Sequence, residues 1–108
     1  MPRYLIQASY TTQGISDLVK NPQDRTAAVR PVIERMGGKL ESIYFAFGEY
    51  DAMLIVELPD NVAMAAISMA VGASGAFRSF KTTVLISMDE AVEAMRKAGT
   101  ISYRPPGR

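Results

Sequence analysis

Four consecutive residues, Gly48-Glu49-Tyr50-Asp51, form the most distinctive local motif of this chain. Their two carboxylates could coordinate a hard cation, and the tyrosine hydroxyl could hydrogen-bond a ligand. The same residue types also suit a β-hairpin, because glycine adopts a positive φ readily and aspartate accepts hydrogen bonds from nearby backbone N–H groups. Turn chemistry alone accounts for Gly48 and Asp51, so the motif favours a structural role in which Tyr50 packs over the turn.

Three further tyrosines, Tyr4, Tyr10 and Tyr44, lie on predicted strands. Neighbouring antiparallel strands could bring their hydroxyls together beside Arg78, and such a cluster would bind an anion or a phenolic ligand. The alternative, which we favour, buries the rings in the core and leaves each hydroxyl bonded to backbone or water. Lys81 lies three positions beyond Arg78, so the two side chains point to opposite sheet faces and cannot line one pocket without a bulge. The ligand-binding candidates are therefore Tyr4, Tyr10, Tyr44, Tyr50 and Arg78.

The residue types that carry much of enzyme chemistry are missing. The chain of 108 residues contains no His, no Cys and no Trp, which excludes thiolate nucleophiles, disulfides, Cys-ligated metals and a His-ligated haem. Glu41 and Glu57 could approach across a hairpin as an acid–base pair, but a solvated surface pair is the simpler interpretation. The sequence therefore assigns no catalytic residue and predicts neither a metal nor a cofactor.

Charge and hydropathy exclude two further classes of partner. The formal net charge is +1, from 12 basic and 11 acidic residues. The basic end of the chain carries only four positive charges, a small electrostatic footprint, so no nucleic-acid partner is expected. The start of the chain has no long apolar segment typical of a secretory signal, and the uncharged stretch 61–77 is short and contains Asn, Ser and Gly. We therefore expect a cytoplasmic protein without a membrane partner.

The candidate residues must be positioned by a small set of strands and helices. Alternating side chains predict four strands, over residues 3–10, 39–47, 51–58 and 77–86. Helical spacing and capping residues predict helices over 15–20, from an Asn21 cap to Met36 with a kink at Pro31, from Asp60 or Asn61 to Gly72 or Gly75, and from Ser87 to Ala98. Arg25 lies off the apolar stripe of the second of these helices, and the last one can dock on the domain through Ala91, Val92, Met95 and Ala98.

This order is β-α-β-β-α-β with a C-terminal helix, a ferredoxin-like α+β arrangement. In such a fold two helices cover one face of a four-stranded antiparallel sheet, and the other face stays bare. Both faces of the hairpin formed by 39–47 and 51–58 are apolar over much of their length. Two sheets packed face to face would bury the bare surface, so the pattern predicts a homodimeric α+β barrel.

The helix after Asp60 predicts a second contact between subunits. Met64, Ile67 and Val71 form one ridge, a row of alanines forms another, and no charged residue lies between Asp60 and Arg78. A helix that is apolar all round needs more cover than its own sheet provides. We therefore expect assembly beyond a dimer, or a ligand cleft between this helix and the sheet.

The sequence resembles the GYD domain family, whose Gly-x-Tyr-Asp core is matched by Gly48, Tyr50 and Asp51. The resemblance extends over most of residues 4–90. It implies a dimeric α+β barrel of bacterial type, in a family without an established biochemical activity. Further matching segments are Tyr4-Leu5-Ile6, Tyr10-Thr11-Thr12-Gln13-Gly14, Gly37-Gly38-Lys39-Leu40, Leu58-Pro59-Asp60 and Ala73-Ser74-Gly75-Ala76-Phe77-Arg78.

Two hypotheses about function follow. The first is an oligomeric small-ligand-binding or structural module without catalysis, in which residues 1–99 form the GYD-like domain and residues 100–108 a basic, proline-containing tail. The second is a cofactor-independent enzyme acting on a small organic substrate, with Tyr44, Tyr50 or Arg78 at a barrel pocket. A solvated tail is expected under both hypotheses.

Overall fold

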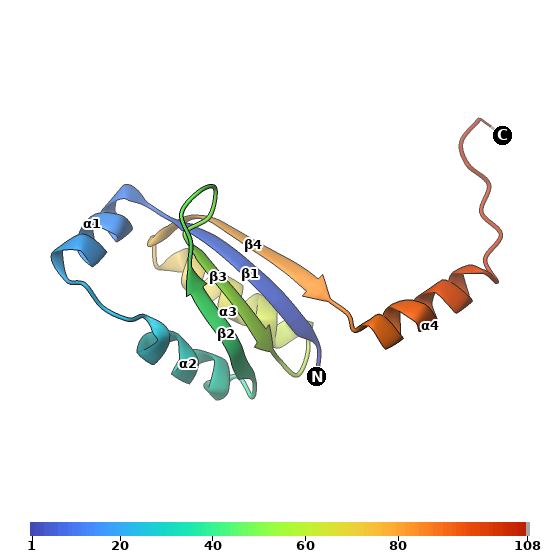
Figure 1. Ribbon diagram of the computed structural model, residues 1–108, viewed down its shortest axis with the longest axis horizontal. Coiled ribbons are helices and arrows are strands. Elements are labelled where there is room, and N and C mark those ends of the chain that lie inside the picture. The colour runs from blue at the N-terminus through green and yellow to red at the C-terminus, as the bar shows by residue number, and fades with distance from the viewer. Residues whose placement is uncertain (108) are drawn as a thin grey trace.

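The computed structural model describes residues 1–107, and its centre is a four-stranded antiparallel sheet of order β2-β3-β1-β4 (Figure 1). The two central strands, β1 and β3, pair with each other, so each edge of the sheet is formed by one of the outer strands. The predicted ferredoxin-like α+β fold is confirmed in this topology. The strands are β1 (Arg3–Tyr10), β2 (Lys39–Phe45), β3 (Ala52–Glu57) and β4 (Phe77–Leu85).

The structure assigns four helices to the described residues, and their positions match the predicted order of elements. Two of them lie in the connection between β1 and β2, one lies between β3 and β4, and one follows β4. The helices are α1 (Thr12–Lys20), α2 (Thr26–Arg35), α3 (Asn61–Ala73) and α4 (Met88–Ala98).

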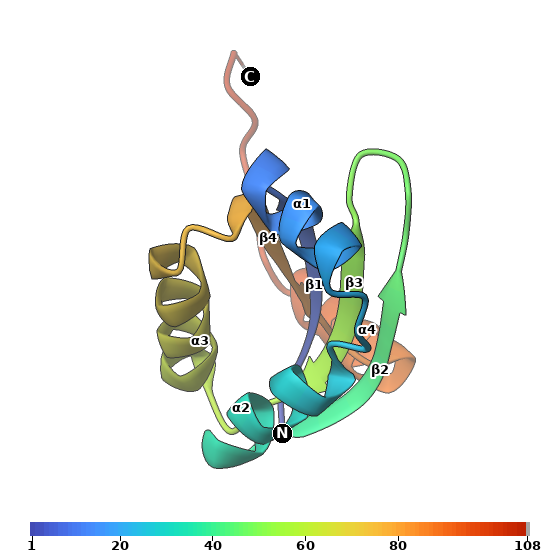
Figure 2. The same cartoon turned by 90° about the vertical axis from the view of Figure 1, so that its left-hand side faces the viewer.

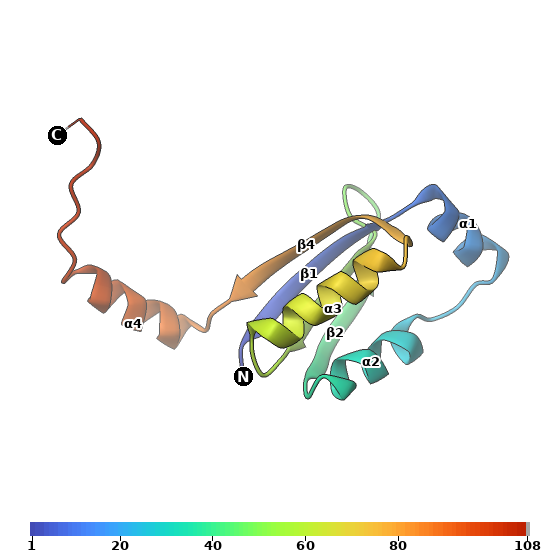
Figure 3. The ribbon, with the colours of Figure 1, turned by 180° about the vertical axis from the view of Figure 1, so that it is seen from behind.

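Helices α2 and α3 lie on one face of the sheet, which we call the helix face (Figure 3). The opposite face carries no helix and is turned towards the viewer in Figure 1; we call it the open face. The core lies between the sheet and the two helices, and partly buried Val29, Met36 and Val71 pack against it. Its buried hydrophobic residues are Tyr4, Ile6, Ala8, Ile33, Leu40, Ala52, Leu54, Val56, Leu58, Ala63, Met64 and Ile67.

The connection from β1 to α2 differs from its prediction. Helix α1 begins at Thr12, because the Thr11 hydroxyl accepts a hydrogen bond from the Gly14 N–H over 3.1 Å. Asn21, predicted as the cap of the next helix, instead follows the last residue of α1. The following helix starts only at Thr26. The N–H of Thr26 donates a hydrogen bond of 2.9 Å to the Asp24 carboxylate. The predicted helix therefore exists as α2, but the prediction that it begins at Asn21 was wrong.

The predicted strict alternation along β2 is also wrong. A bulge between Leu40 and Ser42 inserts one residue into this strand. Leu40 is buried under the helices, and beyond the bulge Ile43 and Phe45 return to the same side, opposite buried Leu54 and Ala52. The bulge shifts the large apolar residues of β2 towards the helix face.

Helix α3 follows its prediction closely. The Asp60 carboxylate accepts the Ala63 N–H over 2.9 Å and caps the first turn. Ala63, Met64 and Ile67 are buried against the sheet, whereas Ala66, Met69 and Ala70 are exposed on the outer side. The exposed outer ridge matches the surface on which a second subunit contact is predicted.

Helix α4 departs most from its prediction. Its Ser87–Glu90 capping box is confirmed, with the Glu90 N–H donating to Ser87 Oγ over 3.1 Å and the Ser87 N–H donating to Glu90 over 3.0 Å. The predicted docking of this helix on its own domain is wrong, because none of its residues is buried and it projects away from the sheet (Figures 1 and 3). The radius of gyration is consequently 17.4 Å, against about 13 Å for a compact domain of this length.

Candidate binding site

The hairpin that joins β2 to β3 is held against β1 by Asp51 and Ser9. The Asp51 carboxylate accepts the Tyr10 N–H over 3.0 Å, and the Asp51 N–H donates to the Ala8 carbonyl over 2.9 Å. The buried Ser9 hydroxyl donates to the Glu49 carbonyl over 2.7 Å. Gly48 has a φ of 147°, as turn chemistry predicts for a glycine here. Gly48 and Asp51 thus have the conformational and hydrogen-bonding roles that their residue types favour.

Tyr10 lies at the centre of an aromatic row beside this hairpin. Its ring stacks on Phe77, with centroids 4.5 Å apart, and lies 6.4 Å from the ring of Phe45. Phe80 continues the row, with its ring edge towards Phe77. The row occupies the helix face at the end of the sheet where β1 leads into α1.

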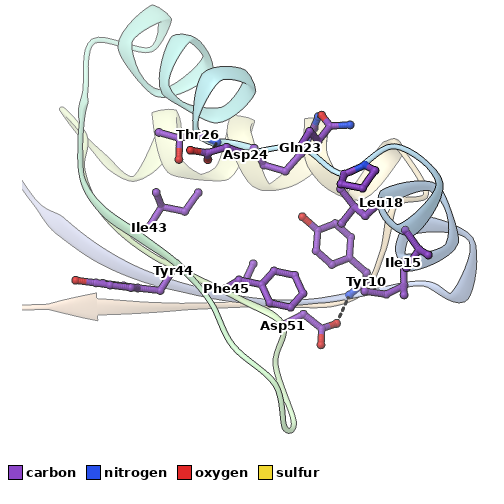
Figure 4. Close-up of a pocket in the computed structure, with 14 residues that line it drawn as sticks. Tyr10, Ile15, Leu18, Gln23, Asp24, Thr26, Ile43, Tyr44, Phe45 and Asp51 are labelled. Atoms are coloured by element: carbon purple, nitrogen blue, oxygen red, sulfur yellow. Dashed lines mark hydrogen bonds between the residues drawn. The ribbon is translucent and has the colours of Figure 1, made fainter.

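A cavity of about 780 Å³ opens above Tyr10 and Phe45, between the sheet and the segment that joins α1 to α2 (Figure 4). Ile43 and Tyr10 point into it from the sheet. Its walls are mainly apolar, and its polar groups lie near Tyr10 and on the segment that precedes α2. The remaining lining residues are Ile15, Leu18, Val19, Pro22, Gln23, Asp24, Arg25, Thr26, Tyr44, Asp51 and Ala52.

Two charged side chains act on the Tyr10 phenol. Burial raises the pKa of Tyr10 above its ordinary value, and the Asp51 carboxylate adds to this increase. The positive charge of the Arg25 guanidinium opposes this increase in the pKa of Tyr10, because it favours the phenolate. The cavity therefore places a phenol hydroxyl and a guanidinium beside apolar walls, an arrangement suited to a small apolar molecule that carries an anionic group.

The raised pKa of Tyr10 predicts a measurable pH dependence. The folded state keeps the phenol protonated above pH 10, near which an unperturbed tyrosine ionises. This contribution to stability is fully present below pH 10 and is lost as the pH rises through the pKa of the folded state. The difference in absorbance at 295 nm between wild type and Tyr10→Phe, followed against pH, should have its midpoint above 10. A midpoint at or below 10, with circular dichroism showing a folded chain, would contradict the burial of this phenol.

The open face presents a different surface, with an apolar centre and a polar rim. By register, Leu5, Met53 and Ile55 lie side by side on the two central strands, each partly exposed. Tyr44 pairs with Met53 from the edge strand and is 65% exposed. The expected row of large apolar groups is thus present at the centre of this face, with Gln7, Ser42, Lys81 and Thr83 around it.

One end of the open face carries an ion-pair cluster. Arg3 Nη2 contacts Glu41 over 2.7 Å and Glu57 over 3.2 Å. The two glutamates do approach across the β2–β3 hairpin, but a guanidinium bridges them. Such partly exposed pairs contribute little to stability, roughly 0–1 kcal/mol. The guanidinium offsets one of the two carboxylate charges and holds both carboxylates in ion pairs, so the cluster does not form an acid–base pair.

The predicted site residues are not brought together. Tyr4 is buried in the core, where its hydroxyl donates to Asn61 Oδ1 over 2.6 Å. Tyr10 lines the cavity from the helix face of the sheet. Tyr44 borders the same cavity from the edge strand β2, where it pairs with Met53. Tyr50 is partly buried in the hairpin loop, and Arg78 is exposed at a register shift between β1 and β4. Of the five candidates, Tyr10 and Tyr44 contribute to the cavity wall.

Sequence reasoning missed Arg25, Ile15 and Leu18 as parts of a site. Arg25 was assigned to the solvent side of a helix, but the structure places it just before α2 and close to Tyr10. The pattern of Ile15 and Leu18 on a short helix after an aromatic strand end is the one signal that could have indicated this cavity.

Residues 1–107 lack two other kinds of functional feature, a cluster of metal ligands and a membrane-spanning helix. Within this part of the chain, no group of three or more acidic side chains is arranged to hold a metal ion. Among the same residues no helix has both the length and the apolar character that crossing a membrane requires.

Comparison with known proteins identifies relatives for most of the chain. The family model described as "GYD domain" matches residues 4–95. A protein of Thermus thermophilus named "Glutamine synthetase and cystathionine beta-lyase binding protein" is 29% identical over 80 residues, which are 73% of this chain and 83% of the relative.

Three solved structures share the fold at low sequence identity. FFRP-DM1 has a TM-score of 0.50 at 15% identity, over 80% of this chain and 100% of its own. MtbAldR has a TM-score of 0.51 at 17% identity, over 80% of this chain and 52% of its own, so the match spans about half of that protein. The hypothetical protein PHS023 of Pyrococcus horikoshii has a TM-score of 0.51 at 16% identity, over 81% and 92%. These likenesses show the fold alone.

Proposed function

The chain belongs to the GYD domain family, and from this premise we propose that it is an oligomeric binding module that acts through protein contacts. The observation that carries this proposal is the open face, a sheet surface with an apolar centre and no helix on it. We assign this face to a second copy of the chain, with the two sheets packed towards each other as in a dimeric α+β barrel.

One protomer leaves the apolar centre of its open face uncovered. Leu5, Met53 and Ile55 occupy neighbouring positions on central strands, where a fold of this class has either helices or another sheet as cover. A rim of polar side chains around an apolar centre is the usual composition of a protein–protein interface. Self-association buries the same patch on both copies and requires no second kind of surface.

The Thermus relative supports a binding role of this kind. That protein is named as a binding protein for two enzymes, glutamine synthetase and cystathionine beta-lyase. We extend from it to this chain only the class of partner, another protein, which the assembled module would contact through surfaces outside the dimer interface. The exposed outer ridge of α3, with Ala66, Met69 and Ala70, is one such surface.

A charge on the open face tests the proposal. We expect Ile55→Glu to convert the oligomer to a monomer, because a carboxylate at the centre of an apolar interface loses its hydration without gaining a partner. Light scattering after size exclusion measures the mass, and circular dichroism checks that the variant is folded. Val32→Glu, at an exposed position on α2, is the matched control and should leave the mass unchanged. An Ile55→Glu variant that is folded and keeps the wild-type mass would exclude the open face as the interface.

The cavity above Tyr10 supports a second candidate function, the binding of a small apolar anion. The supporting observation is the Tyr10 phenol beside the Arg25 guanidinium in an apolar cavity. Benzoate is a suitable probe, since bound benzoate would place a negative charge next to the phenol and raise the pKa of Tyr10 further. An unchanged titration of Tyr10 in millimolar benzoate would count against this candidate.

A further inference from the structure

Helix α4 and its connection to β4 form an arm, and the described part of the chain buries none of the residues of this helix. The helix projects from the end of the sheet in Figures 1 and 3, and it lies behind the sheet in the end-on view of Figure 2. Only Ile86 and Ser87 separate it from β4, and the capping box fixes its first turn. A helix of 11 residues is marginally stable alone in water. A stable α4 therefore requires a surface to pack on.

The arm is strongly amphipathic. Met88, Val92 and Met95 follow the spacing i, i+4, i+7 of one helix face, and they are 76%, 38% and 64% exposed. The acidic and basic residues of the helix lie on the other side. A stripe of this kind is typical of a helix that buries one face against protein or membrane.

The described part of the chain leaves the stripe uncovered, because no residue of α4 is buried. A shallow groove at the start of α4 is lined by the connecting residue Ile86 together with Asp89, Glu90, Glu93, Ala94 and Lys97. Met88, Val92 and Met95 lie outside this groove, on the opposite side of the helix. The protomer's own sheet does not cover the stripe.

The charges of the arm argue for a protein surface and against a lipid surface. Its polar side carries the acids Asp89, Glu90 and Glu93 against the bases Arg96 and Lys97. An interfacial membrane helix typically presents a mainly basic polar face to anionic headgroups. A mixed set of charges is instead common on helices that contact protein and remain partly solvated.

The area of the open face points to a second copy of this chain as the occupant. Four strands of about seven residues span a flat area of roughly 450 Å², and each partner of a standard interface buries about 800 Å² of accessible surface. The exposed stripe of α4 adds apolar area to that of the open face, so an interface that contains both is larger than one formed by the sheets alone. In a two-fold dimer each copy offers one arm and receives one.

We propose that α4 docks on a second copy of the chain, with Met88, Val92 and Met95 against the margin of the partner's open face. This inference rests on the proposed function, because it requires that the chain self-associates. It adds that the two protomers exchange their C-terminal helices, and that the partner stabilises each arm.

Cross-linking tests the exchange directly, since the chain has no cysteine of its own. A tagged Met95→Cys chain is mixed with untagged chains carrying Tyr44→Cys or Thr83→Cys, which place the thiol on the open side of either edge strand. We expect a disulfide between tagged and untagged chains for at least one of the two positions. Val62→Cys, on α3, is the control and should give none. The proposal would be overturned if neither position gave a disulfide-linked species of one tagged and one untagged chain. It would also be overturned if Val62→Cys gave as much of this species.

Hydrogen exchange separates this proposal from the proposed function. If the arms are exchanged, α4 amides are protected at least tenfold in the wild-type oligomer and lose this protection in Val92→Glu/Met95→Glu, which alters exposed or half-exposed positions only. If the wild type is oligomeric but its α4 amides exchange as fast as in the double variant, the exchange of arms is wrong and the open-face interface stands. If the wild type is monomeric at every concentration, both are wrong.

Discussion

Replacing Gly38 with alanine should destabilise the domain by about 3 kcal/mol. A Cβ at this position would overlap the Glu57 carbonyl oxygen, and it would lie 2.6 Å from Leu58 Cδ2 and 3.2 Å from Ile33 Cγ2. The first of these atoms is backbone and the other two belong to buried side chains, so none moves easily. The substitution therefore pushes the segment that follows α2 away from the end of β3, and this disturbs the core packed between α2 and the sheet.

The measurement is thermal unfolding followed by circular dichroism, in which a loss of this size lowers Tm by more than about 10 °C. Gly72→Ala is the matched control, because Gly72 lies in α3 with no atom within 4 Å of the position of a Cβ. That change should be neutral or stabilise the protein by up to about 1 kcal/mol. Equal Tm values for the two variants would show that the approach of α2 to β3 is looser than described.

Replacing Tyr4 with alanine should destabilise the domain by about 3–5 kcal/mol. Tyr4 is 1% exposed and is among the largest fully buried side chains, so its removal leaves a cavity in the centre of the core. Tyr4→Phe should be much milder, about 1 kcal/mol. It removes only the bond of the hydroxyl to Asn61, an exposed residue that water can solvate instead.

Chemical denaturation of both variants measures these differences. The contrast between them distinguishes a core residue from a ligand-binding one, because a role in binding would require the hydroxyl and not the packed ring. A Tyr4→Ala variant that unfolds within about 1 kcal/mol of the wild type would contradict the position of this ring in the core.

Local sequence signals predicted much of the fold because they depend on neighbouring residues. The alternation in β1, the Asp60 cap of α3 and the capping box at Ser87 and Glu90 each need only a few adjacent positions. The open face followed from the same alternation, because the side chains of β1 and β3 that point away from the core are themselves apolar.

The features that sequence did not predict depend on long-range contacts. The bulge at Leu40–Ser42 changes which side chains of β2 face the helices, and a sequence does not mark where pairing slips. Asn21 and Pro22 have the residue types of a helix start, but α1 already ends there. The cavity above Tyr10 is lined by Arg25 and Phe45, which are 20 residues apart in the sequence, so no short motif predicts this cavity. Helix α4 was expected to dock because its stripe is apolar, and only the structure shows that the described chain leaves this stripe exposed.

The mass of the wild-type chain in solution shows whether a second copy covers the open face, as the proposed dimer requires. The chain mass is 11.8 kDa. Sedimentation equilibrium at concentrations from about one to several hundred micromolar should give twice that value or a higher multiple, because standard interfaces hold their partners well within this range. A mass of one chain at every concentration would contradict the proposal that a second copy covers the open face.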